Sequence, residues 1–184
     1  MSPVEVLLEE HRVIEGVLNC LERLVDEGTA SGRVDAESAC DAVAFFRGYA
    51  EDLHHDKEEL HLFPAMEAKG LSKRANPTIE VLLEHEAQRE YLAKMDQSAL
   101  AAAAGNKYAL AEFAQNARRF VEMLRQHIAK EDDDIFPLAN EILDQAVQQK
   151  VLAGFMEVDA HRSAGGKFIR IADALAQRYG AQNA

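Results

Sequence analysis

The segment HHDKEELHLFP, residues 54–64, is followed 73 positions later by HIAKEDDDIFP, residues 127–137. Both obey one pattern, H-x-x-K-E-(E/D)-x-x-(L/I)-F-P. Residues four apart share a face of a helix, so each segment places a histidine beside a glutamate as a potential pair of metal ligands. The pairs are His54 with Glu58 and His127 with Glu131.

Apolar residues recur in steps of three and four along most of the chain, which is the spacing of amphipathic helices. The pattern predicts four long helices joined by short breaks, and such helices have antiparallel neighbours. We therefore expect an all-α fold, an up-down-up-down four-helix bundle with a C-terminal helical appendage. The helices are expected from Pro3 to about Gly28, from about Asp35 to Lys69, from Pro77 to the alanine run before Gly105, and from about Lys107 into the second Phe-Pro pair. Residues 1–140 would form the bundle, and residues 141–184 an extension packed on it.

Counting along the helices at about 1.5 Å per residue places one histidine of each helix at the same level of the bundle. A carboxylate at that depth would be costly to keep charged unless a cation neutralised it. His55, the neighbour of His54, is expected to point sideways. The residues expected to meet in one cross-section are His11, His54, Glu58, His85, His127 and Glu131.

A single histidine and glutamate at helical spacing is more often an ordinary side-chain pair than a metal site. Two such pairs, level with histidines on the other two helices, favour a metal site. Imidazole and carboxylate ligands without thiolate suit iron, manganese or zinc. Six candidate ligands exceed what one tetrahedral zinc ion needs, and two carboxylates able to bridge suggest two metal ions. A di-iron centre is the better match.

Four blocks in order, EEHRVIEGVL (9–18), HHDKEELHLFP, LLEHEAQREYL (82–92) and HIAKEDDDIFP, resemble the hemerythrin-like, or HHE cation-binding, domain family over about residues 4–140. The resemblance implies an up-down four-helix bundle around two non-haem iron ions with an oxo or hydroxo bridge; zinc or manganese are possible in their place. It implies that Glu58 and Glu131 bridge the metals. It also implies four terminal ligands, His11, His54, His85 and His127.

The sequence departs from the family pattern on the third helix. Oxygen-carrying hemerythrins have five histidines, two of them four apart on that helix, whereas here His85 is followed at that spacing by Arg89. Candidates for the missing ligand are His61, one turn beyond Glu58, and His161 in the C-terminal extension, although each could instead make an ordinary polar contact. The charged residues beside the repeated pairs are expected in solvent or in contact with the ligands, namely Lys57, Glu59, Lys130 and Asp132.

Composition limits the partners and the compartment. The formal net charge of −12 opposes binding to nucleic acid or to anionic membranes. The sequence has neither an apolar run of the roughly 18 to 20 residues that span a bilayer nor a basic leader ahead of an apolar segment. Cys20 and Cys40 form no C-x-x-C pair, so no thiolate metal site is expected. We expect a cytoplasmic protein.

The expected function is that of a di-iron protein which binds or senses O2, NO or peroxide, in the response to oxidative or nitrosative stress or in iron handling. One alternative is a di-iron enzyme that consumes peroxide or repairs iron centres. Another is a metal-free helical interaction module whose histidines are polar core residues. The sequence identifies no catalytic residue and decides neither the enzymatic status nor the oligomeric state.

Overall fold

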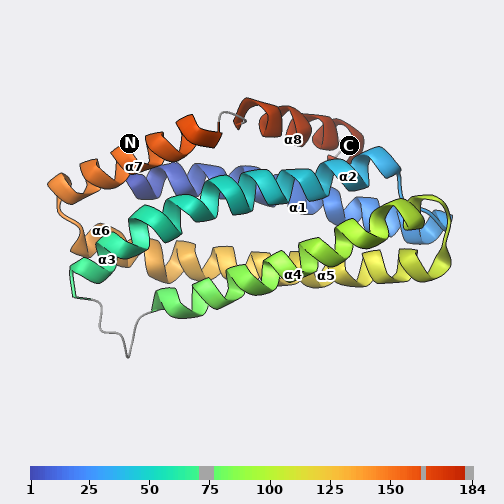
Figure 1. Ribbon diagram of the computed structural model, residues 1–184, viewed down its shortest axis with the longest axis horizontal. Helices are drawn as coiled ribbons and strands as arrows, with labels where there is room; N and C mark the ends of the chain where they lie inside the picture. Colours follow the sequence, from blue (N-terminus) through green and yellow to red (C-terminus); the bar gives the residue numbers. More distant parts are fainter. Residues whose placement is uncertain (71–76, 163–164, 181–184) are drawn as a thin grey trace.

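The computed structural model describes residues 1–70, 77–162 and 165–180, and all of its elements in these ranges are helical (Figure 1). The all-α prediction is confirmed. The first helix is α1 (Pro3–Ser31), and the second long stretch comprises α2 (Ala36–Phe45), the π-helical η1 (Phe46–His55) and η2 (Glu58–Leu62), and α3 (Phe63–Ala68). The third is α4 (Pro77–Ala103), and the fourth comprises α5 (Lys107–Lys130), the π-helical η3 (Glu131–Ile135) and α6 (Phe136–Ile142). Two further helices follow, α7 (Gln145–Arg162) and α8 (Gly165–Tyr179).

The long helical stretches run side by side along the longest axis of the molecule, and successive ones point in opposite directions (Figure 1). Helices α7 and α8 lie along the outside of α1 and of the stretch from α2 to η2 (Figure 1). These two helices make up most of the described part of the expected C-terminal extension, and residues 163–164 and 181–184 lie outside the described ranges. None of the described helices is both long and apolar enough to cross a membrane.

Local sequence signals account for where the first two helices begin and end. Ser2 and Glu5 form a reciprocal capping box at the start of α1, which satisfies backbone N–H groups that lack helical partners. The helix ends at Ser31, slightly beyond the expected Gly28, because Gly32 is the residue that adopts a positive φ of 85°. Asp35 then caps α2 by accepting a hydrogen bond from the backbone N–H of Ser38 at 2.9 Å.

Buried apolar side chains of the described residues form two clusters, one toward each end of the long helices. Helix α1 illustrates the arrangement, since Leu7 belongs to one cluster and Ile14 to the other, while His11 lies between them. The fourth stretch repeats it, with Ile128 in one cluster and Ile135 in the other. A buried polar layer therefore separates two hydrophobic cores at the level of the histidines.

The two Phe-Pro pairs share one backbone irregularity. A π-helical turn precedes each pair, η2 before Phe63 and η3 before Phe136, and both phenylalanines are buried in the same hydrophobic cluster. Proline lacks an N–H group and crowds the carbonyl one turn earlier, which a wider turn can accommodate. The prolines do not end the helical stretches, because each stretch continues past its proline, to Ala68 or to Ile142.

Helix α8 docks through an aromatic ring that lies on a glycine. A Cβ atom added to Gly48 of η1 would lie 1.9 Å from Cζ of Phe168, so the contact requires the absence of a side chain. Phe168 packs against the larger hydrophobic cluster. By contrast, a Cβ atom on the exposed Gly16 of α1 would meet nothing within 4 Å.

Substitutions of these two glycines should have opposite effects. Gly48→Ala should displace the Phe168 ring, weaken α8 docking and destabilise the protein by about 1–3 kcal/mol, the usual range for overpacking. Gly16→Ala should stabilise it by about 0.5–1 kcal/mol, since alanine is the better residue inside a helix. Chemical denaturation and amide hydrogen exchange of α8 test both. Equal protection of α8 in Gly48→Ala and the wild type would contradict this packing.

Candidate metal centre

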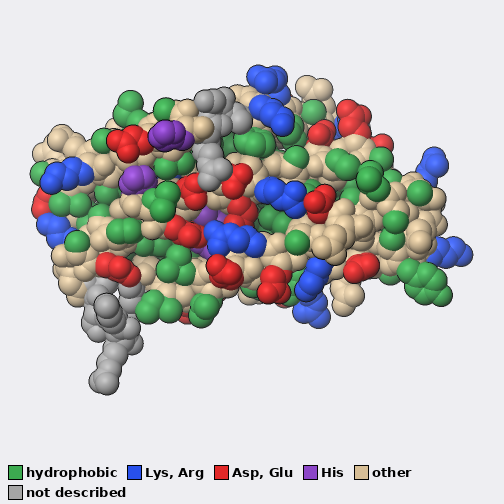
Figure 2. Space-filling view, in the orientation of Figure 1, with side chains coloured by type: hydrophobic (Ala, Val, Ile, Leu, Met, Phe, Trp, Pro, Cys, Tyr) green, Lys and Arg blue, Asp and Glu red, His purple; other side chains and the backbone are tan. Residues whose placement is uncertain are grey.

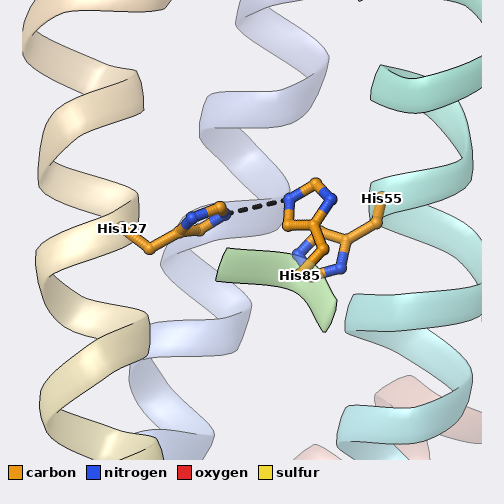
Figure 3. Close-up of side chains that lie close together, drawn as sticks. All are labelled: His55, His85 and His127. Carbon is orange, nitrogen blue, oxygen red and sulfur yellow. Dashed lines mark hydrogen bonds between the residues drawn. The ribbon is translucent and has the colours of Figure 1, made fainter. Parts of the chain in front are cut away.

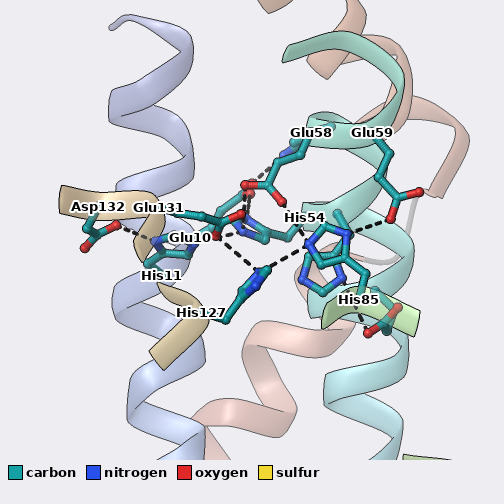
Figure 4. Close-up of polar contacts among 12 residues, drawn as sticks. Glu10, His11, His54, Glu58, Glu59, His85, His127, Glu131 and Asp132 are labelled. Atoms are coloured by element: carbon teal, nitrogen blue, oxygen red, sulfur yellow. Dashed lines mark hydrogen bonds and ion pairs between the residues drawn. The ribbon is translucent and has the colours of Figure 1, made fainter. Parts of the chain in front are cut away.

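Four histidines, one from each long helical stretch of the described chain, meet in the polar layer (Figure 4). They form two pairs whose Nε2 atoms face each other. The Nε2 atoms of His11 and His54 lie 3.0 Å apart, and those of His85 and His127 lie 3.2 Å apart. All four side chains are at most 1% exposed. The layer therefore contains two imidazole pairs, shielded from solvent.

Two glutamates lie between these pairs (Figure 4). Oε1 of Glu58 is 3.5 Å from Nε2 of His54, and its Oε2 is 3.7 Å from Nε2 of His85. Oε2 of Glu131 is 3.3 and 3.4 Å from the Nε2 atoms of the other two histidines. Both glutamates are 0% exposed, and no described residue hydrogen-bonds to any of their carboxylate oxygens. Each carboxylate thus faces both imidazole pairs.

This set of atoms fits two metal ions. Buried carboxylate oxygens without partners are costly, and bound cations would satisfy them. Each imidazole pair could hold one ion, and the two carboxylates could be shared between the ions. Nitrogen and oxygen ligands of this kind suit iron, manganese or zinc.

The other ring nitrogen of each histidine is held by a carboxylate from a different helical stretch. A Nδ1–H group donated to a carboxylate leaves the Nε2 lone pair pointing into the layer, and such contacts fix the ring orientation of metal-binding histidines. The contacts are His11 Nδ1 to Asp132 at 2.7 Å, His54 Nδ1 to Glu10 at 2.9 Å, His85 Nδ1 to Glu59 at 2.7 Å and His127 Nδ1 to Glu84 at 2.9 Å.

Each of these orienting carboxylates is itself accompanied by a cationic side chain. The contacts are Glu10 with Lys57, Glu84 with Lys130 at 2.5 Å, Glu59 with Arg89 at 2.8 Å and Asp132 with Arg12 at 3.8 Å. In both repeated segments, the lysine thus supports the histidine of its own segment through a carboxylate of the preceding helix. Lys57 and Lys130 therefore contact the groups that orient the histidines.

The support of His54 extends into α7. Lys57 is only 1% exposed, and its Nζ contacts both Glu10 and Asp159, the latter at 2.8 Å. The same Nζ lies 5.9 Å from the ring centre of Phe155, also in α7. A buried lysine is unusual unless it is paired. Helix α7 thus contributes an aromatic ring, Phe155, that packs near the Lys57 ammonium group, and one of its two carboxylate partners, Asp159.

The electrostatics of the layer favour protons or cations between the carboxylates. Burial and the neighbouring charge of Glu131 raise the pKa of Glu58 well above its usual value. Burial also acts to raise the pKa of Glu131, but His127 and His11 lower it to about 2. Burial opposes a charge on His11, yet Asp132 and Glu131 raise its pKa to about 9. Metal ions entering the layer would therefore displace protons.

The sequence that forms this layer matches the model of a known protein family. The model of the hemerythrin HHE cation-binding domain matches residues 2–139, which include the four paired histidines, the two glutamates between them and the four carboxylates that contact Nδ1. The chain belongs to this HHE family. Helices α7 and α8 follow the matched range.

The curated relatives add no named activity to the HHE assignment. The chain is 27% identical over 161 residues to an uncharacterized protein of Mycobacterium tuberculosis and equally to one of Mycobacterium bovis. The alignment covers 88% of this chain and 62% of each relative. The chain therefore spans less than two thirds of the length of the curated relatives it matches. No solved structure matches the chain.

The structure brings together all six residues that the sequence placed in one cross-section, but it contradicts the expected position of His55. His55 is 1% exposed, and its ring stacks on that of His85 with 3.7 Å between centroids (Figure 3). The expectation assumed an α-helix, whereas residues 46–55 are π-helical. A π-helix has more residues per turn, so adjacent side chains diverge less and both His54 and His55 face the layer.

His61 and His161, the candidates for a further ligand, are not brought to the layer. Both line a separate surface groove with Asp56 and Glu157, between η2 and α7. The ring of His61 packs on Gly154 of α7, where a Cβ atom would lie 2.2 Å from Nδ1. The groups of described residues that could hold a metal ion include neither histidine.

Sequence reasoning missed the supporting roles of Glu10 and Glu84. A signal was present, because VLLEEH (6–11) and VLLEH (81–85) both place a glutamate directly before the histidine. These segments form a second internal repeat. The separation of His11 and His85 along the sequence differs by one residue from that of His54 and His127. The two halves of the domain therefore carry equivalent contributions to the centre.

Glu58→Gln should separate metal binding from the stability of the metal-free protein. The Glu58 carboxyl has a higher pKa in the folded protein than the value of about 4.5 for the unfolded chain. Its protonated form therefore contributes its full stabilisation of the folded protein below pH 4.5, and this contribution is lost as the pH rises through the folded-state pKa. After removal of metal by chelation, Glu58→Gln should therefore melt higher than the wild type at pH 8, with a smaller difference at pH 5. The variant should also lose metal binding. A lower melting temperature at pH 8 would contradict this account.

Glu10→Gln tests the orienting contacts. The substitution keeps the shape of the side chain but weakens its interactions with His54 and Lys57, so metal affinity should fall by roughly 10- to 100-fold. The matched control is Glu9→Gln, because Glu9 is the exposed neighbour of Glu10. Competition with a chromophoric chelator measures both affinities. Equal affinities in the two variants would show that Glu10 does not orient a ligand.

Proposed function

We propose that the protein is a hemerythrin-like non-haem di-iron protein that binds or senses O2, NO or peroxide. The observation that carries the proposal is the pair of buried carboxylates, Glu58 and Glu131, each facing both imidazole pairs without a hydrogen-bond partner in the described chain. Membership of a cation-binding family supports the same conclusion. A metal-free interaction module offers no reason for this arrangement of unpaired buried groups.

The residues divide into ligands and supports. In this proposal His11 and His54 would hold one iron ion, His85 and His127 would hold the other, and Glu58 and Glu131 would be shared between the two ions. The four orienting carboxylates keep the imidazoles in one tautomer with Nε2 toward the metals. When bound, the iron pair would supply a reversible change of oxidation state and a coordination position for a small ligand.

The burial of the layer favours a small ligand. The histidines and bridging glutamates are at most 1% exposed, and apolar clusters lie on both sides of them. A substrate of more than a few atoms could reach the metals only if helices moved apart. Diatomic molecules and peroxide meet this limit, which supports a role in oxidative or nitrosative stress or in iron handling.

The arrangement of the chain is part of the proposal. We assign residues 1–140 to an up-down-up-down four-helix bundle and residues 141–184 to an extension packed on it. The family match ends at residue 139, which supports the boundary. Val151 and Phe155 of α7 pack into the smaller hydrophobic cluster, which supports the docking of the extension.

Metal analysis of protein purified aerobically from iron-rich medium tests the proposal. We expect about two iron ions per chain and charge-transfer absorption in the near ultraviolet that changes on addition of dithionite and of NO. A protein free of metal would overturn the proposal, and two zinc or manganese ions per chain would overturn its choice of iron. Sustained consumption of peroxide by the iron-loaded sample would instead favour an enzyme.

Variants of two ligands link metal content to stability. His54→Ala and Glu131→Ala should each lose iron and melt at a lower temperature than the iron-loaded wild type, because a metal bound only to the folded state stabilises it. His161→Ala is the control and should retain iron, since His161 is exposed and lies outside the layer. Full iron content in both ligand variants would contradict the assigned ligands.

A further inference from the structure

The four histidines assigned as ligands share a pattern of contacts. In each, Nδ1 faces a carboxylate, and that carboxylate contacts a lysine or arginine. His55 has a similar carboxylate and arginine behind it, but the carboxylate lies at a longer distance. Its Nδ1 lies 3.4 Å from Oε1 of Glu51, and Oε2 of Glu51 lies 2.7 Å from Nε of Arg89. Within the described chain, a fifth buried histidine therefore has Nδ1 toward a carboxylate that contacts an arginine, although the distance from Nδ1 is longer than in the other four.

His55 also lacks the hydrogen bonds that a structural histidine would have. It is 1% exposed, and neither of its ring nitrogens has a hydrogen-bond partner among the described residues. Buried polar atoms are rarely left in this state, so an unpaired imidazole in a protein interior calls for an explanation. A bound cation would provide a partner for one of the two nitrogens.

The position of His55 indicates which cation it would serve. Its ring is stacked on that of His85 at an angle of 12°, and its centroid lies 5.6 Å from that of His127 (Figure 3). One ligand atom from each of these three histidines lies within 4.8 Å of the other two. The second group of potential ligands comprises His11, His54, Glu58 and Glu131.

We propose that His55 is a third imidazole ligand of the cation held by His85 and His127, an inference that rests on the di-iron function proposed above. The centre is then asymmetric, with three imidazoles on one metal ion and two on the other. Arg89 gains a role in this arrangement, because its guanidinium contacts both Glu51 and Glu59. One cationic side chain thus supports the carboxylates behind His55 and His85.

A purely structural role for His55 makes a different prediction. If His55 served only to stack on His85, a phenylalanine at position 55 would preserve the aromatic contact and leave metal binding intact. If His55 is a ligand, the same substitution removes a nitrogen from one metal ion. His55→Phe therefore separates stacking from coordination. His161→Phe is the matched control, since His161 is exposed and outside the layer.

Proton NMR of the full chain loaded with Co²⁺ provides a direct count of imidazole ligands. Each coordinated histidine that keeps its Nδ1–H should give one solvent-exchangeable, paramagnetically shifted resonance. We expect five such resonances in the wild type and in His161→Phe, and four in His55→Phe. Chelator competition measures the affinity for each Co²⁺ ion. For the more weakly bound ion, this affinity should be at least about tenfold lower in His55→Phe than in the wild type, which is comparable to or larger than the loss from removing an orienting contact.

The outcomes distinguish this inference from the function on which it rests. Two Co²⁺ ions with only four shifted resonances in the wild type would overturn the role of His55 while leaving the two-metal centre intact. Unchanged affinity and an unchanged resonance count in His55→Phe would do the same. A wild-type protein that binds no Co²⁺ and no iron would overturn the proposed function itself. Because the wild-type count is informative alone, the test does not depend on the variant being folded.

Discussion

Two carboxylates enclosed between imidazole rings, Glu58 and Glu131, determine how the rest of the molecule is built. Buried anions at this depth are unfavourable unless positive charge, protons or metal ions accompany them. In the surrounding layer, histidines contact the two carboxylates directly. Lysines and arginines contact the second set of carboxylates, those that orient the histidines. The two hydrophobic cores on either side supply the packing that holds the long helices together around this polar layer.

The repeated segments can now be understood as whole units. Within HHDKEELHLFP, His54 and Glu58 face the layer, Lys57 holds the carboxylate behind His54, and Glu59 orients His85 on the next helix. In HIAKEDDDIFP, His127, Lys130, Glu131 and Asp132 make the equivalent contacts. The lysine and the second acid are therefore as much part of the pattern as the histidine and the first glutamate. The pattern records contacts between helices as well as the spacing along one helix.

The sequence predicted the elements that depend on local periodicity and missed those that depend on contacts between helices. The helices and the common level of the six residues follow from residue spacing, because an α-helix advances regularly. The position of His55 was predicted wrongly because nothing in FRGYAEDLHH, residues 46–55, indicates a π-helical backbone. Glu10 and Glu84 were missed because their partners lie on other helices, although their position before His11 and His85 was a readable signal. The link from Lys57 to Asp159 could not be predicted without the docking of α7.

The exchange of supports between the two halves of the domain has a consequence for how the centre assembles. His11 and His54 come from the first half, yet Asp132, which orients His11, lies 121 residues further along the chain. His85 and His127 come from the second half, yet Glu59 of the first half orients His85. A growing chain that has reached only its second helix therefore has neither imidazole pair fully oriented. For the proposed centre, all four imidazoles are oriented only after the fourth helical stretch has returned to α1, so a loaded centre would mark the assembly of all four long stretches.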